Sequence, residues 1–252
     1  MVKYEYQDLE DKTKIPDNCS EFYCYNYKLT ELPVLPNSLI NLWCSYNKLT
    51  ELPELPLSLI EIRCSNNKLI ELPELPNSLI NLYCCNNKLI ELPVLPDSLI
   101  KLHCGDNKLI ELPKLPDSLE GLNCSYNELS ELPVLPKSFK RLICGFNNLT
   151  ELPKLPGSII ELRCYNNNLT ELPELPMILK ELSCFDNNLI ELPELPNSLI
   201  DFWCENNKIK YLSPNNCKVM KKCDRLRVLN NPFSTGFTDN KDFKEYLMNL
   251  NL

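Results

Sequence analysis

The stretch Asn81–Ile100, NLYCCNNKLIELPVLPDSLI, decides the fold because the chain repeats it ten times without an insertion. An unbroken period of this length indicates a solenoid, in which each copy buries its apolar side chains against its neighbours. A residue's place within its copy is called its position, from 1 to 20. The copies begin at Glu21, Asn41, Glu61, Asn81, Lys101, Gly121, Arg141, Glu161, Glu181 and Asp201.

Each copy predicts one short strand followed by an extended return. Positions 2 to 4 alternate between apolar and variable residues, which is typical of a half-buried strand, and position 4 is always cysteine. The leucines and prolines of the LPxLP segment recur every three residues, as in a polyproline II helix. Proline also removes backbone donors, so the return cannot extend a sheet. We therefore predict a solenoid with a single parallel β-sheet on a concave face, extended polyproline II returns on the convex side, and little helix except at the C-terminal end.

Asparagine at position 7 is expected to form a structural ladder. A turn leaves backbone N–H and C=O groups in the interior, and these groups need partners. One amide supplies two donors and one acceptor, so it can join its own turn to the adjacent copy. The ladder residues are Asn47, Asn67, Asn87, Asn107, Asn127, Asn147, Asn167, Asn187 and Asn207.

The two ends of the chain depart from the repeat. Residues 1–20 form a degenerate N-terminal cap, with Val2 and Tyr4 assigned to positions 2 and 4 and an edge strand near them. Residues 21–220 are the ten repeats, and residues 221–252 are predicted to form a final strand and a C-terminal capping helix. All three segments are expected to make one continuous domain.

A short helix is expected to replace the last return, because Ser213 is a suitable N-cap and Pro214 follows at the first helical position. Val228 and Asn231 then take the cysteine and asparagine places of a final turn. The apolar face of the capping helix is predicted to consist of Phe243, Tyr246, Leu247 and Leu250.

The pattern LxxLxCxxNxLxxLPxLPxS resembles the leucine-rich repeat of the short, 20-residue type found in secreted bacterial effectors, with cysteine where valine or leucine is more usual. The asparagine- and cysteine-rich style is also similar to repeat proteins of giant amoeba-infecting viruses. The resemblance implies protein binding on the concave sheet face. Some effectors of this class also carry a ubiquitin-ligase domain.

Variable positions on the predicted concave face supply the candidate binding residues. Trp, Tyr and Arg are enriched at binding hot spots, and a rigid sheet holds them in place before a partner arrives. The candidates are Tyr23, Tyr25, Trp43, Tyr46, Arg63, Tyr83, His103, Arg141, Arg163, Tyr165, Phe185 and Trp203. The alternative is that these side chains only cover the sheet. The glutamates at position 11 are expected to be a solvated ridge, or a rim that selects a basic partner.

Enzymatic chemistry is not expected. Cysteines in single file cannot converge on a zinc ion, so the position-4 column predicts core packing rather than a metal or redox site. Cys85 is the candidate for a reactive thiol because it is expected to face the concave side. The only histidine, His103, has no obvious catalytic neighbour. We expect no metal and no cofactor.

The net charge of −8 argues against nucleic-acid and anionic-membrane partners. Fourteen cysteines, ten of them at one repeat position, indicate a reducing compartment, and the N-terminus has no signal-peptide pattern. We predict a cytoplasmic monomer, in its own cell or in a host cell, that binds a protein partner of unknown identity. Two alternatives are the substrate-recognition part of a ubiquitin ligase without its catalytic domain, and a structural or assembly protein.

Overall fold

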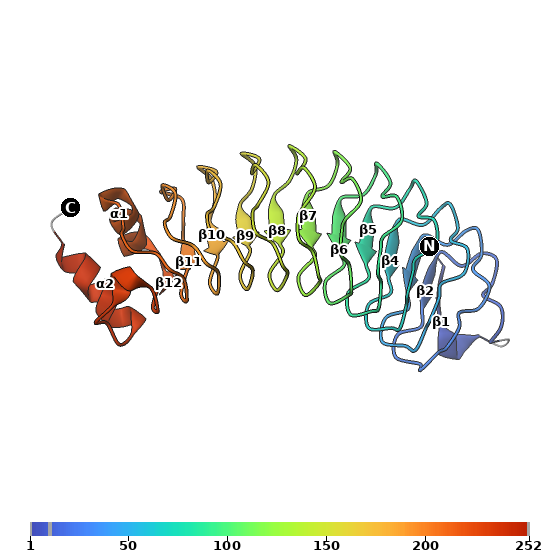
Figure 1. Cartoon of the computed structure of the whole chain (residues 1–252). Coiled ribbons are helices and arrows are strands. Elements are labelled where there is room, and N and C mark those ends of the chain that lie inside the picture. The colour runs from blue at the N-terminus through green and yellow to red at the C-terminus, as the bar shows by residue number, and fades with distance from the viewer. Residues whose placement is uncertain (1, 10–11, 251–252) are drawn as a thin grey trace. The chain divides into compact units, whose positions relative to one another are not determined.

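The computed structural model describes residues 2–9 and 12–250, and it divides the chain into two compact units that meet between Glu128 and Leu129. The predicted caps also include residues 1, 10, 11, 251 and 252, which lie outside the described residues. Within each unit all the strands are parallel, and they follow one another in sequence order (Figure 1).

In the first unit, seven three-residue strands form the sheet. They are β1 (Lys3–Glu5), β2 (Glu21–Tyr23), β3 (Asn41–Trp43), β4 (Glu61–Arg63), β5 (Asn81–Tyr83), β6 (Lys101–His103) and β7 (Gly121–Asn123). A 3₁₀ helix, η1 (Tyr6–Asp8), follows β1.

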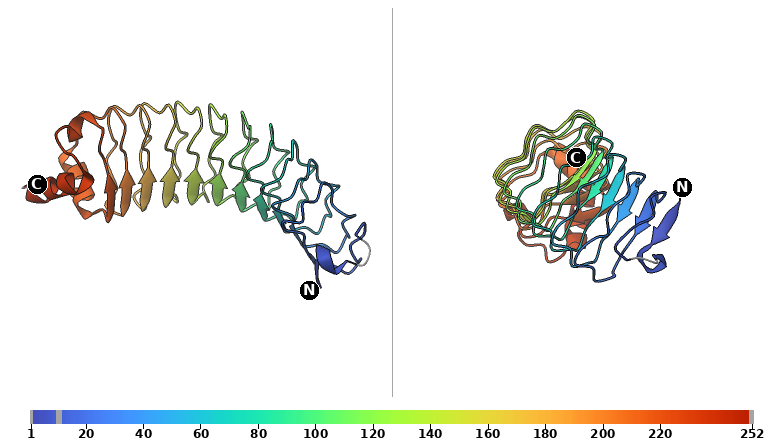
Figure 2. Two further views of the ribbon diagram at one scale, coloured as in Figure 1. Left: turned by 90° about the horizontal axis from the view of Figure 1, so that it is seen from below. Right: turned by 90° about the vertical axis from the view of Figure 1, so that its right-hand side faces the viewer.

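The second unit contains five strands and the helices of the C-terminal end. Its elements are β8 (Arg141–Ile143), β9 (Glu161–Arg163), β10 (Glu181–Ser183), β11 (Asp201–Trp203), α1 (Pro214–Lys222), β12 (Arg225–Arg227), the 3₁₀ helix η2 (Pro232–Ser234) and α2 (Asn240–Asn249). Within each unit the strands line one side of the coil and the returns line the other (Figure 2). The predicted solenoid with extended returns is therefore confirmed.

The interior of each turn is built from the repeated leucines and the cysteine. Residues at positions 2, 4 and 19 are fully or almost fully buried in every repeat, as Leu42, Cys44 and Leu59 illustrate. Cys44 N–H donates to the carbonyl of Arg63 at 2.8 Å, so the turns stay hydrogen-bonded beyond the end of each strand. Burial of this apolar column on both sides of every turn supplies the driving force for stacking.

The position-7 asparagines form the predicted ladder of hydrogen bonds, and each one reaches back to the preceding turn. Asn107 Nδ2 donates to the carbonyls of Cys84 (3.1 Å) and Cys104 (3.0 Å), and its Oδ1 accepts from Leu89 N–H at 3.0 Å. A second ladder was not foreseen. Serine at position 18 also reaches back one turn, as Ser58 Oγ does to the carbonyl of Leu39 at 2.6 Å.

The backbone at position 6 is left-handed in every repeat, with φ between 51° and 61°. Asparagine and aspartate tolerate this conformation, and they occupy the position in seven of the ten repeats. The other three residues are Tyr46, Tyr126 and Phe146, for which a left-handed backbone is unfavourable.

The register assigned to the N-terminal cap was wrong. Tyr4 lies opposite Phe22 in the sheet and therefore takes position 2, not position 4, and Val2 is exposed. Ile15 and Cys19 are buried as expected. The stretch from the position-2 residue, Tyr4, to Ile15 at position 15 is therefore two residues shorter than the same stretch in a full repeat. The returns also make one isolated bridge, between Lys14 and Val34, which the proline argument did not anticipate.

At the C-terminal end, α1 begins as predicted, with Ser213 accepting the N–H of Asn216 at 3.1 Å. The predicted boundary at residue 220 lies within α1. Val228 is buried, and Asn231 donates to the carbonyl of Cys204 at 2.8 Å, so both take their expected places in the final turn. In α2, Phe243 and Leu247 are buried but Tyr246 is half exposed. Tyr246 instead packs on the ring of Phe237, with centroids 5.2 Å apart.

Candidate functional site

The sheet face of the first unit carries a stack of rings with one arginine inside it. Tyr23 meets Trp43 edge to face, with ring centroids 4.3 Å apart. The Arg63 guanidinium carbon lies 5.0 Å from the ring centroids of both Trp43 and Tyr83. Tyr83 in turn packs on His103 at 4.9 Å. This row, Tyr23–Trp43–Arg63–Tyr83–His103, is called the aromatic–arginine stack.

Acidic residues at position 1 hold the stack in place. Glu61 Oε1 accepts from Trp43 Nε1 at 2.9 Å and from Arg63 Nε at 2.7 Å. Glu21 Oε2 accepts the Tyr23 hydroxyl at 2.7 Å and pairs with Lys3 at 2.9 Å. The hydrogen bond from Lys3 lowers the pKa of Glu21, so this carboxylate stays charged at neutral pH.

The sheet face of the second unit carries a ladder of ion pairs instead. Glu161 lies between Arg141 and Arg163, and Arg163 Nε lies 2.9 Å from Glu161 and 2.8 Å from Glu181. Further along, the Arg225 guanidinium lies over the ring of Trp203 at 5.4 Å and makes a two-point pair with Asp201. The row Arg141–Glu161–Arg163–Glu181 is called the ion-pair ladder.

The turns after the strands carry a second set of rings. In the first unit Tyr25 packs on Tyr46, with centroids 5.0 Å apart. In the second unit Tyr165 and Phe185 are stacked at 4.7 Å with an angle of 2° between their planes, and Phe146 meets Tyr165 edge to face. A Cβ at Gly145 would lie 2.5 Å from the Tyr165 ring, so only glycine leaves room for this ring.

The structure thus places the predicted side chains on the strands and following turns of the sheet face, in two groups that belong to different units. Ser183, also at position 3, differs because it is fully buried. Its register neighbours are Arg163 and Trp203, two side chains large enough to cover it.

A scan of protein-family models found no match, and no curated protein sequence matches the chain. Among solved structures, YopM from Yersinia enterocolitica WA-314 is 34% identical, with a TM-score of 0.70, over 87% of this chain and 57% of that one. YopM from Yersinia pestis, described as a leucine-rich effector protein, is 31% identical, with a TM-score of 0.67, over 86% of this chain and 74% of that one.

The chain belongs to the leucine-rich repeat proteins of the short, bacterial-effector-like class. It spans little more than half the length of the first YopM chain. The functional domain of InlJ from Listeria monocytogenes is 26% identical, with a TM-score of 0.72, over 84% of this chain and 54% of that one. That domain is described as including a cysteine ladder. A fold of this kind is that of a protein-interaction module.

The environment of the position-4 cysteines in this leucine-rich repeat chain disfavours thiol reactivity. All fourteen cysteines are free thiols, and those at position 4 are fully buried. Burial raises the pKa of Cys64, Cys124 and Cys164 to about 12. Burial also raises the pKa of Cys85, the candidate reactive thiol, whereas a reactive thiol needs a lowered pKa.

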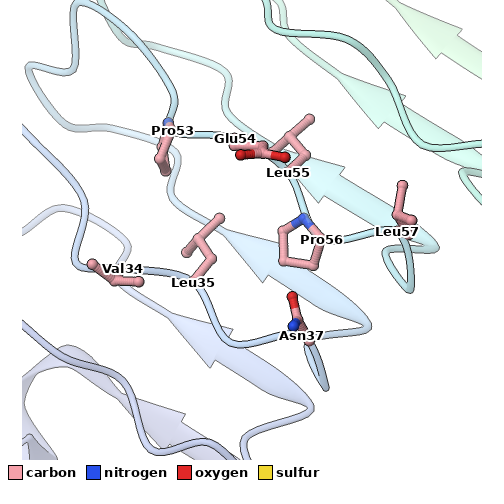
Figure 3. Close-up of a pocket in the computed structure, with 8 residues that line it drawn as sticks. All are labelled: Val34, Leu35, Asn37, Pro53, Glu54, Leu55, Pro56 and Leu57. Atoms are coloured by element: carbon pink, nitrogen blue, oxygen red, sulfur yellow. The ribbon is translucent and has the colours of Figure 1, made fainter.

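The returns carry shallow grooves away from the sheet face. One groove in the first unit is lined by Val34, Leu35 and Asn37 of one return and by 53–57 of the next (Figure 3). A corresponding groove in the second unit lies between the returns that contain Gly157 and Met177. The first groove has one charged side chain, Glu54, and the second has two, Lys154 and Glu174.

One group of site residues was missed by the reasoning from sequence. The position-1 acids Glu61, Glu161, Glu181 and Asp201 were not singled out, although each one holds an arginine of the sheet face. The sequence pattern that could have revealed these acids is an acid at position 1 with an arginine at position 1 or 3 of the same copy or of an adjacent copy.

Within residues 2–9 and 12–250, no three His, Cys, Asp or Glu side chains gather as metal ligands would. None of the helices in this part of the chain has the length and apolar character that a membrane span requires.

Proposed function

We propose that this chain is a non-enzymatic binding module that recognises a partner protein on its sheet face. The observation that carries the proposal is that tryptophan, tyrosine and arginine side chains on this face are held in fixed positions while remaining partly exposed. Glu61, for example, accepts from both Trp43 and Arg63. Side chains held this way lose little conformational entropy when a partner binds.

The rings at position 6 support the same proposal. Tyr46 and Tyr126 are each 50% exposed and Phe146 is 38% exposed, so these residues do not fill the core. A left-handed backbone at such residues costs on the order of 1 kcal/mol each, whereas asparagine would adopt it readily. Aromatic residues kept at a structural disadvantage and partly exposed to solvent are consistent with selection for contact with a partner.

A catalytic role is disfavoured by the chemistry of the candidate nucleophiles. The position-4 thiols are buried, and the raised pKa of Cys164, about 12, keeps it protonated at neutral pH. His103 packs on the ring of Tyr83. These residues act as packing groups in the proposed module.

The proposed setting is a reducing compartment, because all fourteen cysteines are free thiols and disulfides are rare in such compartments. We propose a monomer that binds neither nucleic acid nor membrane, in line with its net charge of −8. The similarity to a leucine-rich effector protein makes the cytoplasm of a host cell a reasonable place to search for the partner.

The test is a pull-down from cell lysate with the wild-type chain and with a triple variant, Trp43→Ala, Tyr83→Ala and Arg163→Ala. A partner captured by the wild-type chain should be lost with the triple variant. The matched control replaces exposed residues of the returns, Glu54→Ala, Val94→Ala and Glu174→Ala, and should capture as the wild type does.

Circular dichroism and thermal unfolding establish that both triple variants remain folded. Equal capture by the sheet-face variant and the wild type, with both folded, would refute the proposal. Loss of capture with the return variant alone would instead place the binding surface on the convex side.

A further inference from the structure

Arg63 differs from the other arginines of the sheet face in how it is held. Its guanidinium lies between the rings of Trp43 and Tyr83, at 5.0 Å from each centroid, and its side chain is half exposed. The two rings restrict the plane of the guanidinium, so its N–H groups are already oriented for a planar acceptor.

Glu61 pairs with the Nε side of the Arg63 guanidinium and not with its Nη side. Its Oε1 accepts from Arg63 Nε at 2.7 Å and from Trp43 Nε1 at 2.9 Å, and its Oε2 lies 3.3 Å from Asn81 Nδ2. In the part of the chain that the structure describes, the only hydrogen bond donated by the Arg63 guanidinium comes from Nε. The Nη1 and Nη2 donors remain for another group.

The second unit contains a tryptophan-stacked arginine that is already occupied. Arg225 lies over Trp203 at 5.4 Å, and the carboxylate of Asp201 accepts from its Nε at 2.7 Å and from its Nη2 at 2.5 Å. A carboxylate is therefore the group that this protein itself places on a stacked arginine. Two-point pairing of this kind is the strongest common contact between an arginine and a carboxylate.

We propose that Arg63 receives a carboxylate from an aspartate or glutamate side chain of the partner protein, with Nη1 and Nη2 donating to its two oxygens. The rings of Trp43 and Tyr83 contact apolar residues on either side of that acid. This inference rests on the proposed function and names the chemistry of the partner segment.

Charge favours a carboxylate over a phosphate at this place. Residues 1–128 contain 11 basic and 19 acidic side chains, whereas residues 129–252 contain 15 of each. Glu21 and Glu61 lie at position 1 on the same face as Arg63. A phosphate group carries nearly two charges and meets more repulsion there than a singly charged carboxylate does.

The chain offers a local reporter for the test. Trp43 and Trp203 are its only tryptophans, so Trp203→Phe leaves Trp43 as the single source of indole emission beside Arg63. A phage-displayed random peptide library is selected on the full wild-type chain, without counter-selection on any variant. The selected peptides are then synthesised and titrated into the Trp203→Phe protein.

The selected peptides should contain an aspartate or glutamate between apolar residues, and binding should change the Trp43 emission. Replacing that acid by its amide should weaken binding about ten-fold or more, as should Arg63→Gln. Arg63→Lys keeps the charge but not the planar fork, so it should recover little of the loss. The control Arg225→Gln, in which the arginine is already paired at two points with Asp201, should leave the affinity within about two-fold of the original.

The outcomes separate the two levels of the proposal. Peptides that lose binding with Trp43→Ala or Tyr83→Ala but bind equally well to Arg63→Gln overturn the carboxylate site and leave the binding face intact. Peptides that are indifferent to every sheet-face substitution overturn the proposed function as well. If Arg63→Gln does not fold, Arg63→Lys and the acid-to-amide peptide decide the question. A larger Trp43 response to inorganic phosphate than to the acidic peptide overturns the choice of ligand.

Discussion

The sheet faces of the two units use the same backbone and different chemistry. In the first unit the stacked group is Arg63, held between two rings, and only its Nε is paired with an acid. In the second unit Arg163 has a glutamate on each side, and Arg225 is paired at two points with Asp201. The first face therefore keeps the Nη donors of Arg63 for a partner, whereas the second places its arginines against acids of its own, through ion pairing alone at Arg163, whose Nε makes no hydrogen bond within the described residues.

The interiors of the two units, in contrast, are the same. Asn107 and Asn167 make equivalent bonds to the preceding turn, and both Oδ1 atoms accept a backbone N–H at 3.0 Å. A solenoid with a uniform interior can vary its surface from turn to turn without a change of fold. Matched substitutions in the two units test whether the units are equal inside and different on the sheet face.

The largest effect is expected from the asparagine ladder. Asn107→Ala and Asn167→Ala should each lower the free energy of unfolding by about 2 kcal/mol, because each leaves buried carbonyls and an N–H without a partner. Urea denaturation followed by circular dichroism measures both. A difference between the two of more than about 1 kcal/mol would contradict the claim of equal interiors.

A smaller effect is expected at Gly145, in the second unit, where the Tyr165 ring lies against the backbone. Gly145→Ala should displace the Tyr165 ring, break its stacking on Phe185 and lower stability by about 1 kcal/mol. Thermal unfolding and near-ultraviolet circular dichroism report the stability and the ring environment.

Two other glycines serve as controls for that measurement. A Cβ at Gly121, in the first unit, or at Gly157, in the second, meets no atom within 4 Å. Gly121→Ala and Gly157→Ala should therefore leave the ring signal unchanged. An unchanged ring signal in Gly145→Ala would show that the close approach of Tyr165 is not a constraint.

Acid should weaken the second unit's arginine pair. The hydrogen bond from Arg225 lowers the pKa of Asp201, so this carboxylate adds stability above its unfolded pKa, about 4, and the contribution is lost as the pH falls through its folded pKa. Asp201→Asn should cost less than about 1 kcal/mol at pH 7, since Arg225 is largely exposed. The difference between wild type and variant should shrink as the pH falls from the unfolded pKa through the lowered folded pKa of Asp201.

Glu205 provides a control of opposite sign. Burial raises the pKa of Glu205, so its charged form opposes folding at neutral pH and its protonation favours folding as the pH falls. Glu205→Gln should be neutral or slightly stabilising at pH 7, and this gain should fade in acid. A loss of stability at pH 7 with Glu205→Gln would indicate that its contact with Arg227 outweighs burial.

The smallest effect is expected from salt. Arg163→Gln should cost a few tenths of a kcal/mol at low ionic strength, and the cost should vanish near 1 M NaCl, where the Debye length is about 3 Å. The cost of Arg63→Gln should persist, because the Trp43 and Tyr83 rings also lose packing area. Urea denaturation at both ionic strengths measures the stability cost of each variant. An equal response of the two costs to salt would contradict the comparison.

Much of the fold could be predicted from the sequence because every copy repeats the same constraints. The leucine and cysteine columns, the prolines of the returns and the position-7 amides each have one physical role, and ten copies repeat it without interruption. The misplaced register of Tyr4 arose where the period is imperfect, since only the pairing with Phe22 locates that strand. The left-handed backbone at position 6 was predictable from its asparagines and aspartates, but this signal was missed.

The candidate site was harder to predict because it depends on lateral contacts. That Arg63 packs between Trp43 and Tyr83 follows from position 3 being in register on three strands. That Arg163 is paired with two glutamates, whereas Arg63 keeps open donors, depends on side-chain directions that the repeat pattern does not encode. The sequence thus identifies the candidate side chains but not which of them are already occupied.

The backward reach of the position-7 amide has a consequence for how such a molecule evolves. Each junction uses the same atoms, with Asn87 bonded to the turn before it as Asn67 is to its own predecessor. A gene duplication or deletion of one 20-residue module therefore leaves every remaining junction chemically complete. Each such event shifts neighbouring surface groups by one strand spacing, about 4.8 Å. Gain or loss of modules during evolution can thus change the distance between two contact points on the surface in fixed increments.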